Sequence, residues 1–536
     1  MLALPILMEL LYFSVAFVCG FIILQLRLPP LIGFLAAGFI LNAAGYQSTP
    51  ILEQIAALGV TLLLFSIGLK LKVKSLTKPY VWGPSTIHLI ITSLLFSGIM
   101  LGFGAFGLPM FIDLSFETAL LIGFALSFSS TVFAVKVLEQ RGEMSSIHGK
   151  LSIGILVMQD VFAVLFLAIS TGKVPNIWAL GLLILLPLLR PLLYKVLNKS
   201  EHGELLPLFG FFFALLVGYQ AFEFAGLKGD LGALIIGMMF ASHKKAGELA
   251  KSLLNFKDLM LVGFFLTIGL NAHLSMEAAI AALLIVLILP LKVALYYLMT
   301  NIFRLRARTS LLNSFTLSNF SEFGLIVCAL AATSGWISGE WLAVMAIAVS
   351  LTFIIASPIN THSNELYVKI EHWLLKHERA IRLEVEQPMS LFQAKILIFG
   401  MGRIGAGAYE TIAQRYPTSV AGVDINSDSV RRHQERGRHV IMADATDPDF
   451  WTRVNHSQVE MVMLAMPKHI QNLTALEQLK AAGFDGQVSA IANYPDQQME
   501  LEELGVQTTY NFYLEAGSGF GEHVTKTLFK DEKYSS

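Results

Sequence analysis

The sequence predicts a polytopic α-helical membrane domain followed by a C-terminal α/β domain with a parallel sheet. Hydrophobic residues make up 55% of the 536 residues and charged residues only 14%, well below the ~25% of charged residues in an average soluble domain. Apolar windows long enough to cross a bilayer recur up to about residue 360. Beyond that point, short apolar runs alternate with helix-prone, charged stretches. This alternation is typical of strands and helices in a doubly wound sheet.

About thirteen apolar windows are long enough to cross the ~30 Å hydrocarbon core of a bilayer. They lie at residues 5–26, 30–45, 52–71, 83–107, 117–138, 147–170, 177–196, 204–226, 229–242, 258–272, 277–303, 309–333 and 340–360. The first has no basic stretch before it and no small-residue cleavage site, so we expect a retained helix and not a signal peptide. Lysines and arginines gather in the loops after odd-numbered windows, and the loops after even-numbered windows contain essentially only Lys173 and Lys228. This bias predicts an outside N-terminus and a cytoplasmic C-terminal domain.

Composition also excludes several classes of protein and site. The net charge of −1 gives no indication of a nucleic-acid partner. The two cysteines, Cys19 and Cys328, both lie inside apolar windows, which excludes a disulfide framework and a cysteine-rich metal site.

The chain divides into three expected parts. These are a membrane domain at 1–360, a charged, helix-prone linker at 361–391 and a Rossmann-like domain at 392–536. In the last part, strands are expected at 395–399, 420–425, 439–442, 461–465 and 487–492, with helical stretches such as 428–436 and 472–482 between them. Strands that alternate with helices in this way indicate a parallel, doubly wound sheet.

A glycine-rich motif, Gly400-Met401-Gly402-Arg403-Ile404-Gly405, follows the first of these strands and opens a helix. In a dinucleotide-binding fold the first glycine permits the tight turn, the second lets the pyrophosphate approach, and the third allows close helix–strand contact. Asp424 ends the second strand and would accept hydrogen bonds from ribose hydroxyls. Asp444 and Ala445 follow the third strand and would face the adenosine. The alternative is a Rossmann-like domain whose loop is empty or purely structural.

Gln159 and Asp160 lie side by side in the middle of the apolar window at 147–170. An aspartate at membrane depth costs roughly 2.5–3.5 kcal/mol on insertion scales. We therefore expect Asp160 to be an ion or proton site, where the carboxylate alternates between a proton and a monovalent cation, K⁺ or Na⁺. The alternative is a carboxylate that pairs structurally with a buried base.

Three further polar features lie at membrane depth. The hydroxyl cluster Ser129-Ser130-Thr131 occupies the window before Asp160, where bonding to the helix backbone is the competing interpretation. Lys292 lies mid-window beside Pro290, which could break that helix. This lysine would pair with Asp160 when no cation is bound, or else snorkel to the interface. Glu322 would bind ions or hydrogen-bond a broken helix, since transporter sites are commonly built from interrupted helices.

Together these stretches resemble the Kef-type potassium:proton antiporters of the monovalent cation:proton antiporter superfamily. The resemblance covers nearly the whole chain. It is carried by Leu58-Gly59-Val60 with the stretch 63–69, Ser129-Ser130-Thr131, Gln159-Asp160, the stretch 264–270, Ser321-Glu322-Phe323 and the glycine motif at 400–405.

The resemblance implies an inverted-repeat fold of about thirteen helices and a homodimer in the bacterial inner membrane, in which a core bundle moves against a dimerisation scaffold. It implies that Asp160 exchanges potassium for a proton, helped by Gln159 and the Ser129-Ser130-Thr131 cluster. It further implies that the C-terminal domain, of the type called KTN or RCK, binds an adenine nucleotide, AMP or NAD(H), and restrains transport through the loop 244–257. Arg403 matches the glycine-loop arginine of the family and would touch nucleotide phosphate.

The chain departs from glutathione-gated members of this family in one stretch. Those members carry further basic residues after the fifth strand, where this chain reads Ile491-Ala492-Asn493-Tyr494-Pro495. We therefore expect regulation by nucleotide alone or by pH.

Three rival functions are considered. A nucleotide-gated potassium channel is disfavoured because the sequence lacks a TVGYG-like filter. A membrane-bound NADH oxidoreductase is disfavoured because haem- or Fe–S-ligating cysteines and a second catalytic domain are missing, so we expect no enzyme. A sodium:proton antiporter stays open, because oxygen ligands bind both ions.

Overall fold

The computed structural model describes residues 3–26, 28, 30–70, 78–141, 143–144, 146–170, 177–200, 203–226, 229–271, 275–379, 382–383, 394–447, 450–451, 454 and 458–528. The chain separates into two compact units, Met1–Val137 with Leu151–Arg382, and Leu138–Lys150 with Leu383–Ser536. Lys173 and Lys228, used above to orient the chain, and residues 384–391 of the expected linker lie outside the described residues.

The described residues of the N-terminal part form helices joined by turns and short irregular segments, with no strand among them. Its helices are α1 (Ala3–Gln25), α2 (Pro30–Ala43), α3 (Pro50–Lys70), α5 (Pro79–Ala105), α6 (Phe116–Ser127), α7 (Thr131–Arg141), α8 (Ile147–Ser170), α9 (Ile177–Lys199), α10 (Leu205–Phe211), η1 (Phe212–Gln220), α11 (Ala221–Phe224), α12 (Gly229–Phe240), α13 (Ala246–Asn271), α14 (Met276–Leu287), α15 (Leu289–Ile302), α16 (Ala307–Thr316), α17 (Glu322–Thr333), α18 (Glu340–Thr361) and α19 (Ser363–Lys376). Within the described residues, eight segments are long and apolar enough to span a membrane, and α2 and α17 are shorter apolar helices.

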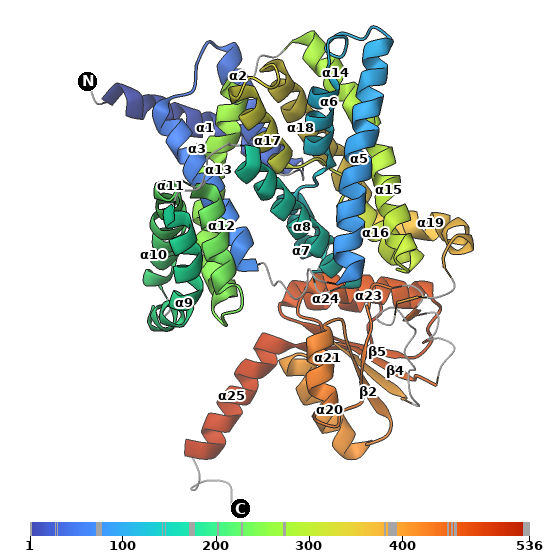
Figure 1. Ribbon diagram of the computed structural model, residues 1–536. Coiled ribbons are helices and arrows are strands. Elements are labelled where there is room, and N and C mark those ends of the chain that lie inside the picture. The colour runs from blue at the N-terminus through green and yellow to red at the C-terminus, as the bar shows by residue number, and fades with distance from the viewer. Residues whose placement is uncertain are drawn as a thin grey trace, which may run out of the picture. The chain divides into compact units, whose positions relative to one another are not determined.

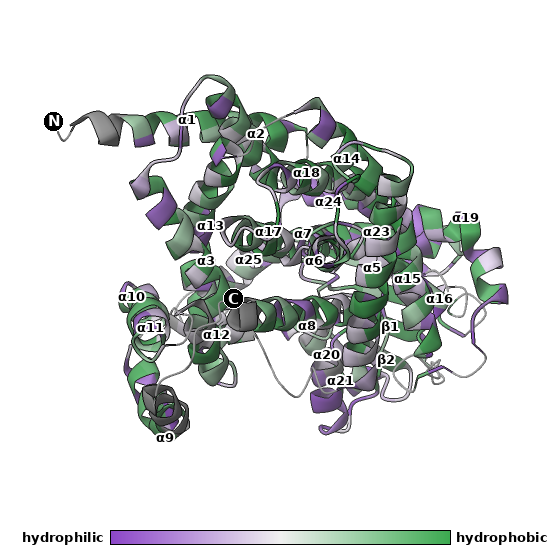
Figure 2. Ribbon diagram, turned by 45° about the horizontal axis from the view of Figure 1, so that its top comes forward, coloured by the Kyte–Doolittle hydropathy of each residue, from purple (hydrophilic) through white to green (hydrophobic). Residues whose placement is uncertain are grey.

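These helices form two groups of closely packed neighbours (Figure 1), which share one hydrophobic core. In one group α13 packs against α2 and α3, and α12 packs against α3 and η1. In the other, α5 packs against α6 and α15, and α18 packs against α14 and α17. Figure 2 shows hydrophobic colour along most of α5, α8 and α14. Large apolar side chains such as Phe17 and Leu287 remain exposed on the outer surface, as expected where lipid is the solvent.

Two of the expected continuous windows are interrupted. The window at 117–138 consists of α6 and α7 with residues 128–130 between them, and Phe128 has extended backbone angles. The window at 309–333 consists of α16 and α17 with residues 317–321 between them. Neither gap contains proline or glycine, so the usual sequence signals for a helix break are missing. A third window, at 277–303, is divided at Ile288, where α14 ends and α15 begins. Pro290 follows directly, so the sequence did indicate this break.

The C-terminal domain contains a six-stranded parallel sheet in the order β3-β2-β1-β4-β5-β6. Its strands are β1 (Ile396–Phe399), β2 (Val420–Asp424), β3 (Val440–Met442), β4 (Met461–Leu464), β5 (Gln487–Ala492) and β6 (Thr508–Asn511). The five expected strands and their parallel arrangement are confirmed. The edge strand β6 was missed, because its residues are largely polar and only one of the four is buried.

Helices cover both faces of this sheet (Figure 1). Ile398 of β1 contributes to a core with residues of α20 (Arg403–Arg415) and α21 (Ser427–Gln434). Its neighbours Leu397 and Phe399 point to the opposite face and pack in a second core that includes residues of α23 (His469–Ala481) and α24 (Pro495–Glu503). The chain order reverses between β1 and β4. Ligands of doubly wound sheets bind at the carboxyl ends of the strands at such a switch point.

Candidate functional site

Residues 128–130 and 317–321, which we call the crossing, are joined to each other by hydrogen bonds. The Ser130 N–H donates to Asn319 Oδ1 at 2.7 Å, and the Ser129 hydroxyl donates to the Leu317 carbonyl oxygen at 2.8 Å. The Phe320 N–H donates to the Thr352 hydroxyl at 3.1 Å. Backbone groups outside a helix must find such partners at membrane depth. Side chains therefore stabilise the two helix breaks in place of proline or glycine.

Lys292 supplies hydrogen-bond donors to carbonyl groups at the crossing and at the end of α6. Its side chain is completely buried, and its ammonium donates to the carbonyl oxygens of Leu126, Phe128 and Asn319 at 3.1, 2.7 and 2.8 Å. An ammonium group has three donors, so these bonds occupy all of them. The ammonium also lies 5.0 Å from the centre of the Phe320 ring. The sequence suggested Asp160 as the partner of Lys292 or a snorkelling side chain, and in this conformation the lysine instead bonds the ends of the interrupted helices.

Asp160 lies on α8 with its side chain 2% exposed. The hydroxyl of Thr131, the first residue of α7, donates to Asp160 Oδ2 at 3.1 Å. This bond places the carboxyl beside the start of the second half-helix, where the positive end of the helix dipole favours negative charge. The structure thus brings together two of the residues expected at the ion site, Asp160 and Thr131.

Gln159 uses its amide to hold α8 against the crossing. Its Oε1 accepts from the Ser129 N–H at 3.0 Å, and its Nε2 donates to the Tyr296 hydroxyl at 2.6 Å and to the Ser127 carbonyl oxygen at 3.3 Å. The sequence analysis expected Gln159 to help coordinate the cation. In this conformation the amide instead fixes backbone and side-chain geometry next to Asp160.

The two remaining candidates belong to the helix starts. The Ser130 hydroxyl accepts from the Phe133 N–H at 3.2 Å, which is the backbone-bonding interpretation considered for this cluster. Glu322 is the first residue of α17 and is 3% exposed, so its carboxylate lies at the positive end of that helix dipole. Ser321 precedes it as N-cap, with its hydroxyl accepting from the Phe323 N–H.

Sequence reasoning missed three buried residues at the crossing: Asn319, Tyr296 and His88. All three side chains are completely buried. His88 stacks on the Tyr296 ring with centroids 3.4 Å apart, and its Nε2 lies 3.3 Å from the Lys292 carbonyl oxygen. An ionisable residue inside an apolar window is itself a functional signal, so His88 could have been predicted as a candidate site residue. Tyr296 gave no comparable signal, because tyrosine is common in membrane helices.

In the C-terminal domain the glycine motif forms the turn between β1 and α20. Gly400 has φ +87°, and a Cβ at this position would lie 2.6 Å from the Ala465 carbonyl oxygen. A Cβ on Gly405 would collide with the Gly400 carbonyl oxygen, whereas a Cβ on Gly402 would meet nothing within 4 Å. The Met401 side chain is buried in the core under α20 and α21, so only its backbone faces the site.

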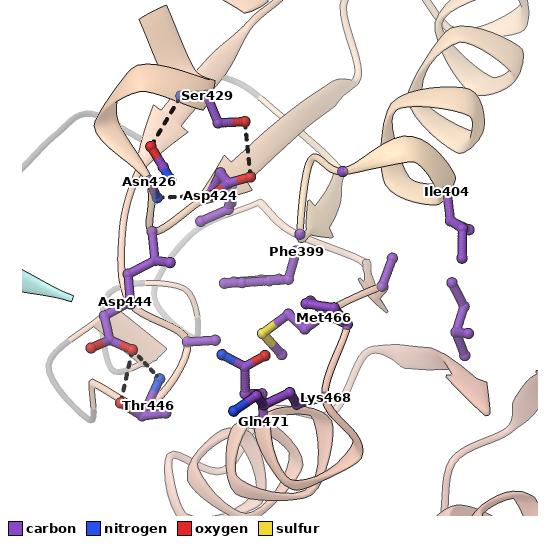
Figure 3. A pocket seen from close by; sticks show the side chains of 18 of the residues that line it. Phe399, Ile404, Asp424, Asn426, Ser429, Asp444, Thr446, Met466, Lys468 and Gln471 are labelled. Carbon is purple, nitrogen blue, oxygen red and sulfur yellow. Dashed lines mark hydrogen bonds between the residues drawn. The ribbon is translucent and has the colours of Figure 1, made fainter. Parts of the chain in front are cut away.

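A pocket opens at the carboxyl ends of the strands, beside this turn. Its lining includes Gly400, Gly402, Arg403, Ile404, Asp424, Asp444 and Ala445, which are seven of the nine residues proposed from sequence to bind nucleotide. Figure 3 shows Asp424, Asn426 and Ser429 on one side of the pocket, and Asp444, Thr446, Lys468 and Gln471 lower in the same view.

Asp424 organises its side of the pocket. Its Oδ2 accepts from the Met401 N–H at 3.1 Å and from the Ser429 hydroxyl at 3.2 Å, and its Oδ1 accepts from the Asn426 N–H at 2.8 Å. Asp444 Oδ1 accepts from the backbone and hydroxyl of Thr446 at 2.9 and 2.8 Å. Polar residues such as Asn426, Lys468 and Gln471 were missed, because they follow the strands without a fixed spacing.

Comparison with known proteins agrees with this architecture. Residues 13–361 match the family described as sodium/hydrogen exchanger, transmembrane, and residues 396–511 match the TrkA-N domain. The glutathione-regulated potassium-efflux system protein KefC of Enterobacter sp. (strain 638) is 24% identical over 93% of this chain and 81% of its own length. The KefC protein of Salmonella schwarzengrund is 26% identical, over 94% of this chain and 82% of its own.

A solved structure shows the same fold in the membrane part. The sodium proton antiporter MjNhaP1 from Methanocaldococcus jannaschii aligns with 69% of this chain and 99% of its own, at 16% identity and a TM-score of 0.50. The fold class expected from the sequence, an antiporter-type helical membrane domain with a Rossmann-like domain, is confirmed. The matched relatives are transporters and not enzymes, in agreement with the sequence analysis.

Proposed function

Because the chain belongs to the sodium/hydrogen exchanger family, we propose that it is a secondary antiporter that exchanges potassium for a proton across the bacterial inner membrane. The observation that carries this proposal is Asp160, a buried carboxyl on α8 held by the Thr131 hydroxyl at the crossing. A charged group at membrane depth is costly and is kept where it has a role in transport.

In this proposal one carboxyl serves two ions in turn. A proton on Asp160 removes the negative charge that a cation needs, and a bound cation stabilises the ionised form and so expels the proton. Lys292 keeps the interrupted helices together by bonding three carbonyl groups. Exchange follows if the protein opens to opposite sides of the membrane only when the carboxyl is occupied. The same proposal includes a homodimer, in which one helix group moves against the other.

Potassium is the favoured cation because the KefC relatives are described as potassium-efflux proteins. Sodium is the second candidate, because MjNhaP1, which shares the fold, is described as a sodium proton antiporter. Asp160, Gln159 and the hydroxyl cluster present oxygen atoms, which suit either ion.

The proposal is tested with purified protein in liposomes that contain a pH-sensitive dye, under a clamped membrane potential. An outside pulse of potassium is expected to make the lumen more alkaline, because each cation that enters drives protons out. If a pulse of sodium produces a larger pH change in the lumen than a pulse of potassium, sodium is the preferred cation. Potassium uptake without any proton movement would support the channel instead and contradict antiport.

We further propose that the C-terminal domain binds an adenine nucleotide, AMP or NAD(H), and thereby regulates transport. The match to the TrkA-N domain and the pocket beside the glycine turn support this. The phosphates would lie at the N-terminus of α20, where the backbone N–H groups of the first helical turn and Arg403 offer donors. Asp424 accepts three hydrogen bonds within the protein. Its carboxylate can accept a further one from a ribose hydroxyl.

Replacing Gly402 by valine is expected to abolish nucleotide binding while the domain stays folded. Among the described residues, no atom beyond the two chain neighbours lies within 4 Å of the added Cβ, so the new side chain would enter the space where the pyrophosphate would lie. Isothermal titration of the purified protein with AMP and NADH measures the loss. Gly407→Val is the matched control, because Gly407 lies on α20 outside the pocket lining and its Cβ would also meet nothing within 4 Å. Unchanged nucleotide affinity in Gly402→Val would contradict this placement of the ligand.

A further inference from the structure

We propose that Tyr296 is a positioning residue for ion exchange, whose hydroxyl ties the helix of Asp160 to both segments of the crossing. This inference rests on the proposed antiport and adds to it, because Tyr296 acts through other residues and does not touch the ion. Tyr296 lies on α15 one turn after Lys292, and its side chain is completely buried. Its hydroxyl lies 2.6 Å from Gln159 Nε2 and 3.2 Å from Ser129 Oγ.

The direction of each hydrogen bond follows from the backbone partners. Gln159 must turn its oxygen to the Ser129 N–H and its nitrogen to the Ser127 carbonyl oxygen, so the amide orientation is fixed. Its NH₂ group therefore donates to Tyr296. The Ser129 hydroxyl donates its single proton to the Leu317 carbonyl oxygen and can only accept from the Tyr296 hydroxyl. The result is a directed chain from Gln159 through Tyr296 and Ser129 to Leu317.

This chain connects four separate elements: α8, α15, residues 128–130 and residues 317–321. Tyr296 is its central link, since its one hydroxyl both accepts from α8 and donates to the crossing. The ring cannot easily turn away, because His88 stacks against it with an interplanar angle of 9°. His88 is in turn placed by the Lys292 carbonyl oxygen at 3.3 Å and the Thr92 hydroxyl at 3.2 Å.

The chain sets the position of the ion-binding carboxyl. Asp160 follows Gln159 directly on α8, and its partner Thr131 follows residues 128–130 directly. Tyr296 therefore fixes the two backbone segments from which the carboxyl and its hydroxyl donor extend. A preorganised site binds its ion more tightly, because fewer groups have to become ordered when the ion binds.

Tyr296→Phe keeps the ring and its stacking and removes only the hydroxyl. In the liposome assay we expect the KM for the driving cation to rise about tenfold or more, because the change removes both buried hydrogen bonds of this hydroxyl. The maximal rate should stay within about twofold, because the exchanging carboxyl is unchanged. Tyr297→Phe is the matched control. It is the next residue on α15, and among the described residues its hydroxyl has no hydrogen-bond partner, so its KM should equal that of the wild type.

The same substitution made in a Gln159→Met protein distinguishes a positioning role of Tyr296 from a general loss of stability. If Tyr296 acts through Gln159, then in a Gln159→Met protein the further change Tyr296→Phe should raise the KM by less than about twofold. An unchanged KM in Tyr296→Phe, or full additivity of the two changes, would overturn the inference. Should Tyr296→Phe fail to assemble, Ser129→Ala tests the same chain from its other end, with a raised KM expected and a wild-type KM contradicting it. Wild-type protein without any exchange would instead contradict the proposed antiport.

Discussion

Replacing Asp160 by asparagine is expected to reduce cation-driven proton flux to the leak of protein-free liposomes. Asparagine has nearly the same shape, and its carbonyl oxygen can still accept from the Thr131 hydroxyl, which donates to Asp160 Oδ2 at 3.1 Å in the wild type. It cannot take up a proton or neutralise a cation. The protein should therefore fold normally and lose exchange, which size-exclusion chromatography and the flux assay measure together.

The control for this change is Asp113→Asn, which removes the same charge from an exposed turn between α5 and α6. It should leave both the rate and the KM unchanged. Proton flux that persists in Asp160→Asn would mean that another group carries the proton. Glu322, buried at the start of α17, would then be the next residue to replace.

Lys292→Met is expected to destabilise the membrane domain by an amount on the order of 3 kcal/mol and to abolish transport. Methionine has a similar length, but it leaves the carbonyl groups of Leu126, Phe128 and Asn319 without the donors seen here. Unpaired carbonyl groups at membrane depth are costly. Removing the buried ammonium relieves its own desolvation cost, which makes the net loss smaller than three full hydrogen bonds.

Thermal unfolding of the purified protein in detergent measures this loss as a lower midpoint temperature. Lys369→Met is the matched control, because Lys369 is exposed on α19 and should change the midpoint little. A Lys292→Met protein that melts like the wild type but no longer transports would show that the ammonium serves the transported ion and not the crossing.

Much of the C-terminal domain could be predicted because its signals are local. The short apolar runs, the glycine motif and the aspartate at the end of β2 each follow from nearby residues, and the sheet order agrees with them. Gly400, with φ +87°, is a position where sequence and backbone geometry correspond directly. Strand β6 lacked such a signal, since only Asn511 of its four residues is buried.

The membrane site was predicted only in part. Asp160 and Lys292 stood out because charge is rare in apolar windows, but the partners of Lys292 did not follow from composition. They are backbone carbonyl groups exposed by two helix breaks that contain neither proline nor glycine. Asn319 bonds to Ser130, and Tyr296 bonds to Ser129. The residues of each pair lie far apart in the sequence, so only the folded structure shows these contacts.

The central claim is that a proton and a cation compete for Asp160, and proton release on cation binding tests it most directly. Wild-type protein in weakly buffered detergent solution, held at a pH where the carboxyl is protonated, is mixed with potassium chloride while a dye reports the pH. About one proton per protomer is expected to be released as the cation binds, and none from Asp160→Asn under the same conditions. Potassium binding without proton release from the wild type, or equal release from both proteins, would contradict exchange at this carboxyl.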